Sequence, residues 1–207
     1  MDFLKNSKLA LNKAVKIIND GGVIIFPTDT VYGFLARADN KKAVEKIYKI
    51  KKRPRQKPLA VFLKDIKMAK ELAEISKEQE KLLKRYWPGK YTFVLKRKKE
   101  IKLYGFNKKT VALRVPKFKP LNDLLKKINK PLAQTSVNIS GQPSIVKVKE
   151  IKEKFTKMGV SLIISGGDLS RRPRQQSGRR GSSILSGPKN KPSVIIDLTK
   201  DVLTRLR

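Results

Sequence analysis

Three short segments of this 207-residue chain bring together the hydroxyl, amide and cationic side chains that bind small charged substrates. Residues 27–33 (PTDTVYG) carry two hydroxyls, a carboxylate and a phenol directly after an apolar run. Residues 51–58 (KKRPRQKP) place five cations on a loop with two prolines, and arginine and lysine are common phosphate ligands. Residues 134–141 (QTSVNISG) alternate so that Ser136 and Asn138 share one side of a strand end. Together these residue types favour a phosphate-rich substrate.

Each segment also has a simpler explanation. Thr, Asp, Asn and Ser side chains often make local hydrogen bonds in turns, and a basic loop stabilises the C-terminal end of the helix before it. Arg114 is a sharper case, because it lies between Leu113 and Val115 in an otherwise apolar strand. It either faces solvent or, if buried, faces a carboxylate or a phosphate, because an unpaired buried cation is costly.

The composition excludes several kinds of chemistry. The chain has no His and no Cys, so it has no histidine-based catalytic triad, thiol nucleophile, disulfide or thiolate zinc site. Neither a P-loop nor a GxGxxG pattern is present. Lys and Arg total 50 against 17 Asp and Glu, and the resulting charge of +33 predicts attraction to polyanions. Because no signal-peptide pattern or membrane-spanning apolar run occurs, we expect a cytoplasmic protein with no membrane partner.

A sheet must position these segments, because loops directly after buried strands are where open α/β sheets bind ligands. Strands and helices follow one another irregularly, which predicts an α/β fold with a mixed sheet and helices packed on it. We expect one domain over residues 1–207. The predicted strands are 23–26, 59–63, 91–95, 110–115, 132–136, 160–165 and 193–198, and the predicted helices are 11–18, 40–53, 76–87, 118–128 and 147–157.

Residues 168–192 form a long basic loop without hydrophobic periodicity. They hold seven Lys or Arg residues against one Asp. Loops of this length are usually functional or disordered. Three roles stay open for this one: a surface tether, a lid that orders over a bound ligand, and an arm that docks nucleic acid.

Six motifs occur in the order and spacing of the YrdC/Sua5 family, which the chain resembles from about residue 19 to residue 207. They are PTDTVYG, KKRPRQKPL, WPGKYTFVL, TVALRVP, TSVNISG and PSVIIDLT, and they begin at residues 27, 51, 87, 110, 135 and 192. The resemblance implies a YrdC-like twisted sheet of parallel and antiparallel strands, with flanking helices around a basic, concave nucleotide pocket. It points to the short form of the family, which lacks an additional C-terminal domain.

The resemblance also implies a reaction. L-threonine, bicarbonate or CO2, and ATP would give threonylcarbamoyl-AMP and pyrophosphate, as in an L-threonylcarbamoyladenylate synthase, a nucleotidyltransferase that serves the t6A modification at tRNA position 37. ATP would be a substrate that carries its own Mg²⁺, no metal would be bound by the protein, and the product would pass to the t6A transferase complex. The alternative is a non-catalytic YrdC-like module that binds double-stranded RNA or tRNA, which the positive charge favours.

The family's site residues transfer to this chain motif by motif. The K-x-R…S-x-N signature, which the resemblance marks as catalytic, falls on Lys51, Arg53, Ser136 and Asn138. The ATP-binding positions are Arg53, Lys57, Thr110, Ser136, Ser144 and Arg207. The threonine-binding positions are Thr28, Thr30, Tyr32, Arg114 and Ser193, with Arg114 as the partner of the threonine carboxylate. One departure is Phe62, which stands where some relatives have a polar residue that touches threonine.

Overall fold

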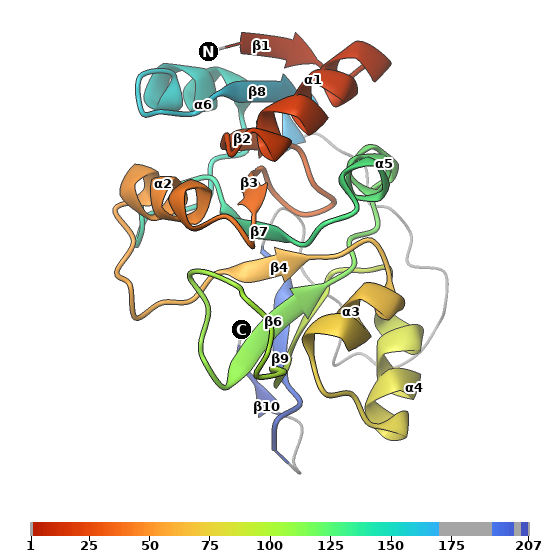
Figure 1. Ribbon diagram of the computed structural model, residues 1–207. Helices are drawn as coiled ribbons and strands as arrows, with labels where there is room; N and C mark the ends of the chain where they lie inside the picture. Colours follow the sequence, from red (N-terminus) through yellow and green to blue (C-terminus); the bar gives the residue numbers. More distant parts are fainter. Residues whose placement is uncertain (1, 170–191, 201–203, 207) are drawn as a thin grey trace.

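The structure is a computed structural model that describes residues 2–169, 192–200 and 204–206. In these ranges the helices are α1 (Lys8–Asn19), α2 (Lys41–Lys51), α3 (Ile66–Leu72), α4 (Lys77–Tyr86), α5 (Lys119–Ile128) and α6 (Val148–Phe155) (Figure 1). The strands are β1 (Asp2–Lys5), β2 (Ile24–Phe26), β3 (Gly33–Arg37), β4 (Ala60–Phe62), β5 (Tyr91–Lys96), β6 (Thr110–Arg114), β7 (Leu132–Ser136), β8 (Leu162–Ser165), β9 (Val194–Asp197) and β10 (Thr204–Arg205).

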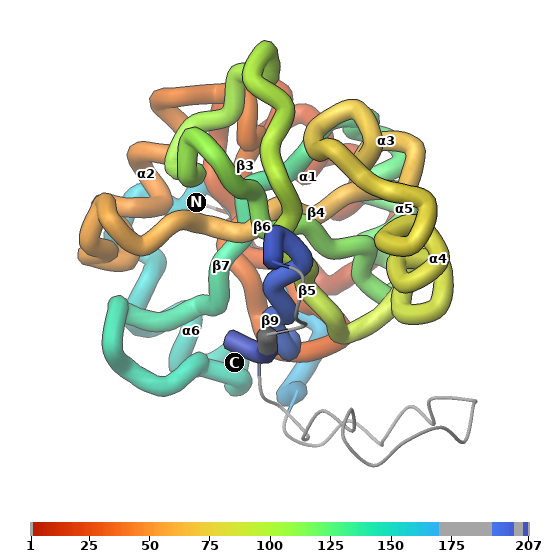
Figure 2. Tube along the Cα trace, turned by 90° about the horizontal axis from the view of Figure 1, so that it is seen from below, coloured from red at the N-terminus to blue at the C-terminus, as the bar shows by residue number. Residues whose placement is uncertain are grey.

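The strands form one mixed sheet in the order β1-β8-β2-β3-β7-β4-β6-β5-β9-β10. The parallel neighbours are β1 with β8, β8 with β2, β4 with β6, and β5 with β9, and the other neighbours are antiparallel. Helices flank the strands on both sides, as the view from below shows (Figure 2). The predicted α/β fold with a mixed sheet is confirmed. The basic, concave pocket stays a prediction.

Local sequence signals explain where the helices near the site begin and end. The Asn40 side chain accepts a hydrogen bond from the Ala43 N–H and so caps α2, as its sequence predicts. That helix ends at Lys52, which adopts the left-handed conformation with φ of 51° and turns the chain into the basic loop. Ser76 and Gln79 form the predicted capping box of α4.

The two faces of the sheet are covered unequally. Helices α1 and α5 cover one face, in an apolar cluster that includes Phe62 and Leu132 but no described residue of β5, β6 or β9. Helices α2, α3, α4 and α6 pack on the other face, which buries Val111 and Leu113 of β6. Thr110 of the same strand is only half-buried, because alternate residues of a strand point to opposite faces.

We call this half-buried side of the central strands the open face. Register places its members together, because Ala60 pairs with both Ala112 and Gln134, and Val94 also pairs with Ala112. The open face is made of Ala60, Val94, Thr110, Ala112, Gln134, Ser136 and Ile195, each of which is half-buried.

Four short elements are additional to the predicted ones: β1, β3, α3 and β10. Strand β3 corrects the prediction that Gly33 lies in a loop, because Gly33 pairs with Phe26 and Ser136. The predicted 168–192 loop falls almost wholly on residues outside the described ranges. Within the described part of the chain, no helix is long and apolar enough to cross a membrane.

Candidate functional site

Several of the predicted nucleotide-binding residues that the structure describes lie at one end of the open face. Ala60 begins β4 and pairs with both Ala112 and Gln134, so the loop before it lies beside Thr110 and Ser136. That loop is the basic 51–58 segment. Three parts of the chain that are far apart in sequence therefore meet where the resemblance places ATP.

Lys51 lies at the centre of this end as a buried ammonium, with 1% of the residue exposed. Its Nζ donates to the Ser136 carbonyl at 2.6 Å, the Asn138 carbonyl at 3.0 Å and Asn138 Oδ1 at 2.7 Å. The Phe34 ring lies on another side, with its centroid 5.8 Å from Nζ. Burial lowers the pKa of the Lys51 ammonium to about 7, and the positive charge of Arg53 acts in the same direction.

Asn138 is the hub of the same network. Its Oδ1 accepts from Lys51 and from the Ser136 hydroxyl, the latter at 2.8 Å. Its Nδ2 donates to the carbonyl oxygens of Ile139 at 3.0 Å and Gln142 at 2.5 Å. The structure thus joins three of the four signature residues directly. Their predicted role in catalysis stays a prediction.

Arg53, the fourth signature residue, folds back over its own loop. Its Nε donates to the Lys57 carbonyl at 2.9 Å and its Nη2 to the Pro58 carbonyl at 2.8 Å. The Tyr48 hydroxyl also donates to the Lys57 carbonyl, at 3.1 Å. These bonds fix the basic loop, while the Lys57 side chain is exposed and has no partner among the described residues.

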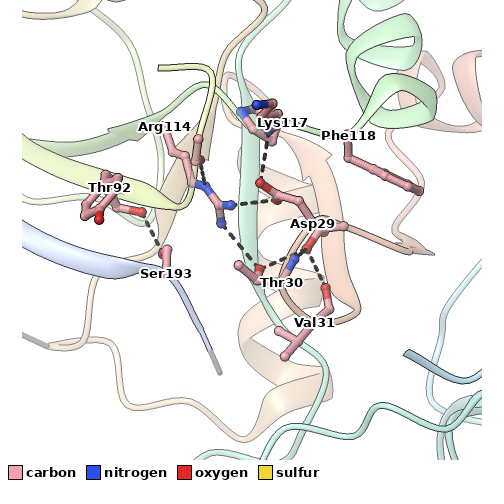
Figure 3. Close-up of polar contacts among 12 residues, drawn as sticks. Asp29, Thr30, Val31, Thr92, Arg114, Lys117, Phe118 and Ser193 are labelled. Atoms are coloured by element: carbon pink, nitrogen blue, oxygen red, sulfur yellow. Dashed lines mark hydrogen bonds and ion pairs between the residues drawn. The ribbon is translucent and has the colours of Figure 1, made fainter. Parts of the chain in front are cut away.

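Thr30, one of the predicted threonine-binding residues, lies against Arg114 at the other end of β6, whereas Tyr32 lies beside Val137, whose N–H donates to the Tyr32 carbonyl. Arg114 lies four residues after Thr110 along the strand, which is about 13 Å at roughly 3.3 Å per residue. The guanidinium donates from Nη2 to Asp29 Oδ1 at 2.6 Å and from Nε to the Gly89 carbonyl at 2.9 Å (Figure 3). Asp29 is the carboxylate that a buried arginine requires, although it was not among the predicted site residues.

Phe62 packs against the same guanidinium, with its ring centroid 5.5 Å from Arg114 Cζ. The two residues are paired neighbours on the parallel strands β4 and β6. Phe62 therefore supplies an aromatic ring that supports the cation.

The 27–33 loop arranges its hydroxyls around the ion pair. Thr28 Oγ1 donates to the Val31 carbonyl at 2.6 Å and accepts from the Thr30 N–H at 3.0 Å. The Thr30 hydroxyl lies 3.4 Å from Arg114 Nη1, at the long limit of a hydrogen bond. The loop is thus the turn that its residue types predict, and the turn also lies against Arg114.

Tyr32 makes a long-range connection that the sequence alone did not indicate. Its hydroxyl donates to the Gly167 carbonyl at 2.7 Å and accepts from the Gly166 N–H at 2.9 Å. These glycines follow β8 and precede the predicted basic loop. The phenol therefore ties the 27–33 loop to the beginning of that segment.

Ser193, the residue directly before β9, lies at the threonine end. Its hydroxyl lies 2.8 Å from the hydroxyl of Thr92, a buried residue of β5 on the side of the open face (Figure 3). Of the other predicted residues, Ser144 is half-buried beside Ile145, whose N–H donates to the Val137 carbonyl. Arg207 lies outside the described residues.

The geometry defines a class of α/β protein with a half-open sheet face, a buried lysine beside a basic loop at one end, and a buried ion pair at the other. A family model of the Sua5/YciO/YrdC domain, described as "Telomere recombination", matches residues 16–207. The chain therefore belongs to the Sua5/YciO/YrdC family.

Curated relatives fall into two groups of different length. Threonylcarbamoyl-AMP synthase of Pyrococcus abyssi is 36% identical over 157 residues, which are 75% of this chain and 46% of that protein. Uncharacterized protein YciO of Escherichia coli is 31% identical over 194 residues, which are 92% of this chain and 84% of that protein. The chain thus spans about half the length of the first relative and most of the second.

Solved structures of Sua5 and YciO proteins are also similar to this chain. P. abyssi Sua5 complexed with L-threonine matches with a TM-score of 0.82 and 30% identity, over 100% of this chain and 56% of that chain. E. coli YciO matches with a TM-score of 0.81 and 30% identity, over 100% of this chain and 92% of that chain. The fold of this chain is therefore that of the Sua5 and YciO structures.

Proposed function

We propose that the chain is an L-threonylcarbamoyladenylate synthase that forms threonylcarbamoyl-AMP and pyrophosphate from L-threonine, bicarbonate or CO2, and MgATP. Membership of the family supports this, as do the relative named threonylcarbamoyl-AMP synthase and the related Sua5 structure with L-threonine. The observation that carries it is the placement of two clusters, around Lys51 and around Arg114, at the two ends of one open sheet face.

Each end fits one substrate. At the Arg114 end the guanidinium binds the threonine carboxylate, because the described residues take only three of its five N–H donors. Hydroxyls of Thr30 and Ser193 lie at the same end for the threonine side chain. At the other end, the Arg53 and Lys57 loop and the 136–142 segment bind the triphosphate, whose negative charge the basic loop complements.

The reaction needs positioning more than it needs a protein nucleophile. The threonine amine adds to CO2 and loses a proton, which gives a carbamate. A carbamate oxygen then attacks the α-phosphorus of ATP, the bond to the β-phosphate bridging oxygen breaks, and pyrophosphate leaves. A chain without Cys or His can promote this step by holding the carbamate near the α-phosphorus and by stabilising the phosphate charge.

Binding experiments test this assignment at both ends. Isothermal titration with ATP and with L-threonine should give saturable binding of each, and either ligand should tighten binding of the other. L-valine, which has the shape of threonine without its hydroxyl, is the control and should bind at least tenfold more weakly. If neither ligand binds while double-stranded RNA or tRNA does, the protein is the non-catalytic RNA-binding module that its charge also allows.

A further inference from the structure

We infer that Lys51 is a positioning residue, which sets the conformation of the 136–142 segment and does not itself bind the phosphates. The inference deepens the proposed function and rests on it for the identity of the ligand, ATP. The contacts that carry it lie within the protein, so the positioning can be measured without any ligand.

All three N–H donors of the ammonium are already used inside the protein. An ammonium has three donors and no acceptor, and Lys51 has three oxygen partners within 3.0 Å. The residue is 1% exposed, and the Phe34 ring lies 5.8 Å away. To reach a phosphate, Nζ would have to leave one of these buried oxygens without its donor.

The Asn138 side chain is also fully engaged. Its carbonyl oxygen accepts from Lys51 and Ser136, and its amide nitrogen donates to the carbonyl oxygens of Ile139 and Gln142. An amide can make about four hydrogen bonds, so none is left for a substrate. Lys51 and Asn138 thus form one unit that folds the segment.

With these side chains engaged, the groups of the segment that can bind a ligand are backbone N–H groups. The N–H groups of Asn138, Ile139 and Gly141 have no acceptor among the described residues. Gly141 has φ of +87°, a conformation that favours glycine, and a Cβ added there would meet no atom within 4 Å. Backbone N–H groups held in a turn are suited to phosphate oxygens, and the segment supplies three of them.

The neighbouring Lys52 is the matched control. It carries the same charge one residue further along the chain, but it is exposed and caps the end of α2. If positive charge alone attracted ATP, substitution of either lysine would weaken ATP binding. If Lys51 acts through the 136–142 segment, only the substitution of Lys51 would weaken ATP binding.

The test compares Lys51→Met with Lys52→Met by two measurements. In the ligand-free protein, Lys51→Met should speed amide hydrogen exchange at least tenfold for residues 137–142, while exchange in β3 and β7 stays as in the wild type. The same variant should weaken ATP binding at least tenfold per folded molecule. Lys52→Met should change either quantity by less than about twofold.

A double-mutant cycle separates positioning from direct contact. If Lys51 and Asn138 act through one segment, Lys51→Met with Asn138→Ala should weaken ATP binding no more than the worse single variant does. Multiplicative losses, or lost ATP binding with unchanged exchange at 137–142, would mean that the ammonium contacts the phosphates itself, and would overturn the inference. Faster exchange across the whole sheet with normal ATP affinity would also overturn it, because Lys51 would then act on stability alone.

Two further outcomes are decided by the same measurements. If Lys51→Met does not fold, Asn138→Ala alone should speed exchange at 137–142, and unchanged exchange would overturn the inference. If the wild-type protein binds no ATP, the proposed function fails. The exchange result of the ligand-free variants still decides whether Lys51 positions the segment.

Discussion

Asp29 and Arg114 form an ion pair of 2.6 Å between Oδ1 and Nη2, with side chains that are 1% and 2% exposed. Asp29 also accepts the Lys117 N–H at 3.0 Å through Oδ2, so one carboxylate holds both the guanidinium and the chain that follows β6 (Figure 3). The pair holds Arg114 against the 27–33 loop. The first of our predictions depends on this arrangement.

Removal of the Asp29 carboxylate should destabilise the protein strongly. Asp29→Ala leaves a buried guanidinium without its anion, and loss of one partner of a buried pair typically costs about 3–5 kcal/mol. Urea unfolding measures the loss. Glu74→Ala is the control, because it breaks the exposed Lys96–Glu74 pair and should cost less than about 1 kcal/mol. Equal losses in the two variants would show that Asp29 does not stabilise Arg114.

Arg53 and Lys52 should differ in their effect on ATP, although they are adjacent and carry the same charge. Arg53→Ala should weaken ATP binding by about 2–5 kcal/mol, because a half-buried charge-assisted contact is lost together with the fixed shape of its loop. Lys52→Ala removes an exposed cation and should cost well under 1 kcal/mol. Titration calorimetry with ATP compares the two. Similar affinities for both variants would remove Arg53 from the nucleotide site.

The stability of the protein should depend on pH through Lys51. Burial lowers the pKa of this ammonium from 10.5 to about 7, whereas the unfolded chain keeps its lysine near the ordinary value. Between these pH values the unfolded state binds more protons, so the free energy of unfolding should rise with pH relative to Lys51→Met. The relative gain should be at most about 1.4 kcal/mol per pH unit.

Urea unfolding of both proteins at several pH values from 6.5 to 9.5 measures this effect, because other groups contribute equally and cancel in the difference. Below about pH 7 the difference should be constant, since Lys51 is protonated in both states. A difference that stays constant up to pH 9.5 would show that the pKa of Lys51 is not lowered.

Tyr32→Phe should loosen the connection between the 27–33 loop and the end of β8. The variant removes the hydroxyl that joins Gly166 and Gly167, and it should cost about 1 kcal/mol while speeding amide exchange at Gly166. Tyr104→Phe, which removes a hydroxyl from a half-buried tyrosine on another loop, should leave that exchange unchanged. If Gly166 exchanges equally fast in both variants, the Tyr32 hydroxyl does not hold this segment.

Most of the regular structure could be predicted from the sequence, because most of the elements carry local signals. Asn40 and the Ser76–Gln79 box both cap helices as predicted, and the apolar runs of β2, β4 and β7 are strands. The missed strand β1 has four residues and pairs with residues far away in sequence, such as Phe3 with Ile163. Strand β3 begins at Gly33, the residue that ends the predicted 27–33 loop. Helix α3 did have a local signal, the cap that Asp65 provides to the Met68 N–H.

The residue types of the candidate site could be predicted from the sequence. Which of these side chains contact one another could not. The strand-interior position of Arg114 predicted a carboxylate or phosphate partner, and Asp29 is that carboxylate. Sequence reasoning did not choose Asp29, because the loop that carries it meets β6 only through the order of strands in the sheet. In the same way, no local signal in the sequence shows that the Lys51 ammonium donates to the backbone carbonyl groups of Ser136 and Asn138.

Formation of the proposed product tests the central claim most directly. The purified protein is incubated with carbon-13-labelled bicarbonate, L-threonine and MgATP, and the mixture is analysed by mass spectrometry and for pyrophosphate. The account predicts threonylcarbamoyl-AMP that carries one labelled carbon, with an equal amount of pyrophosphate, and neither product when threonine is omitted. Absence of labelled threonylcarbamoyl-AMP from a folded protein that binds ATP and threonine would contradict it.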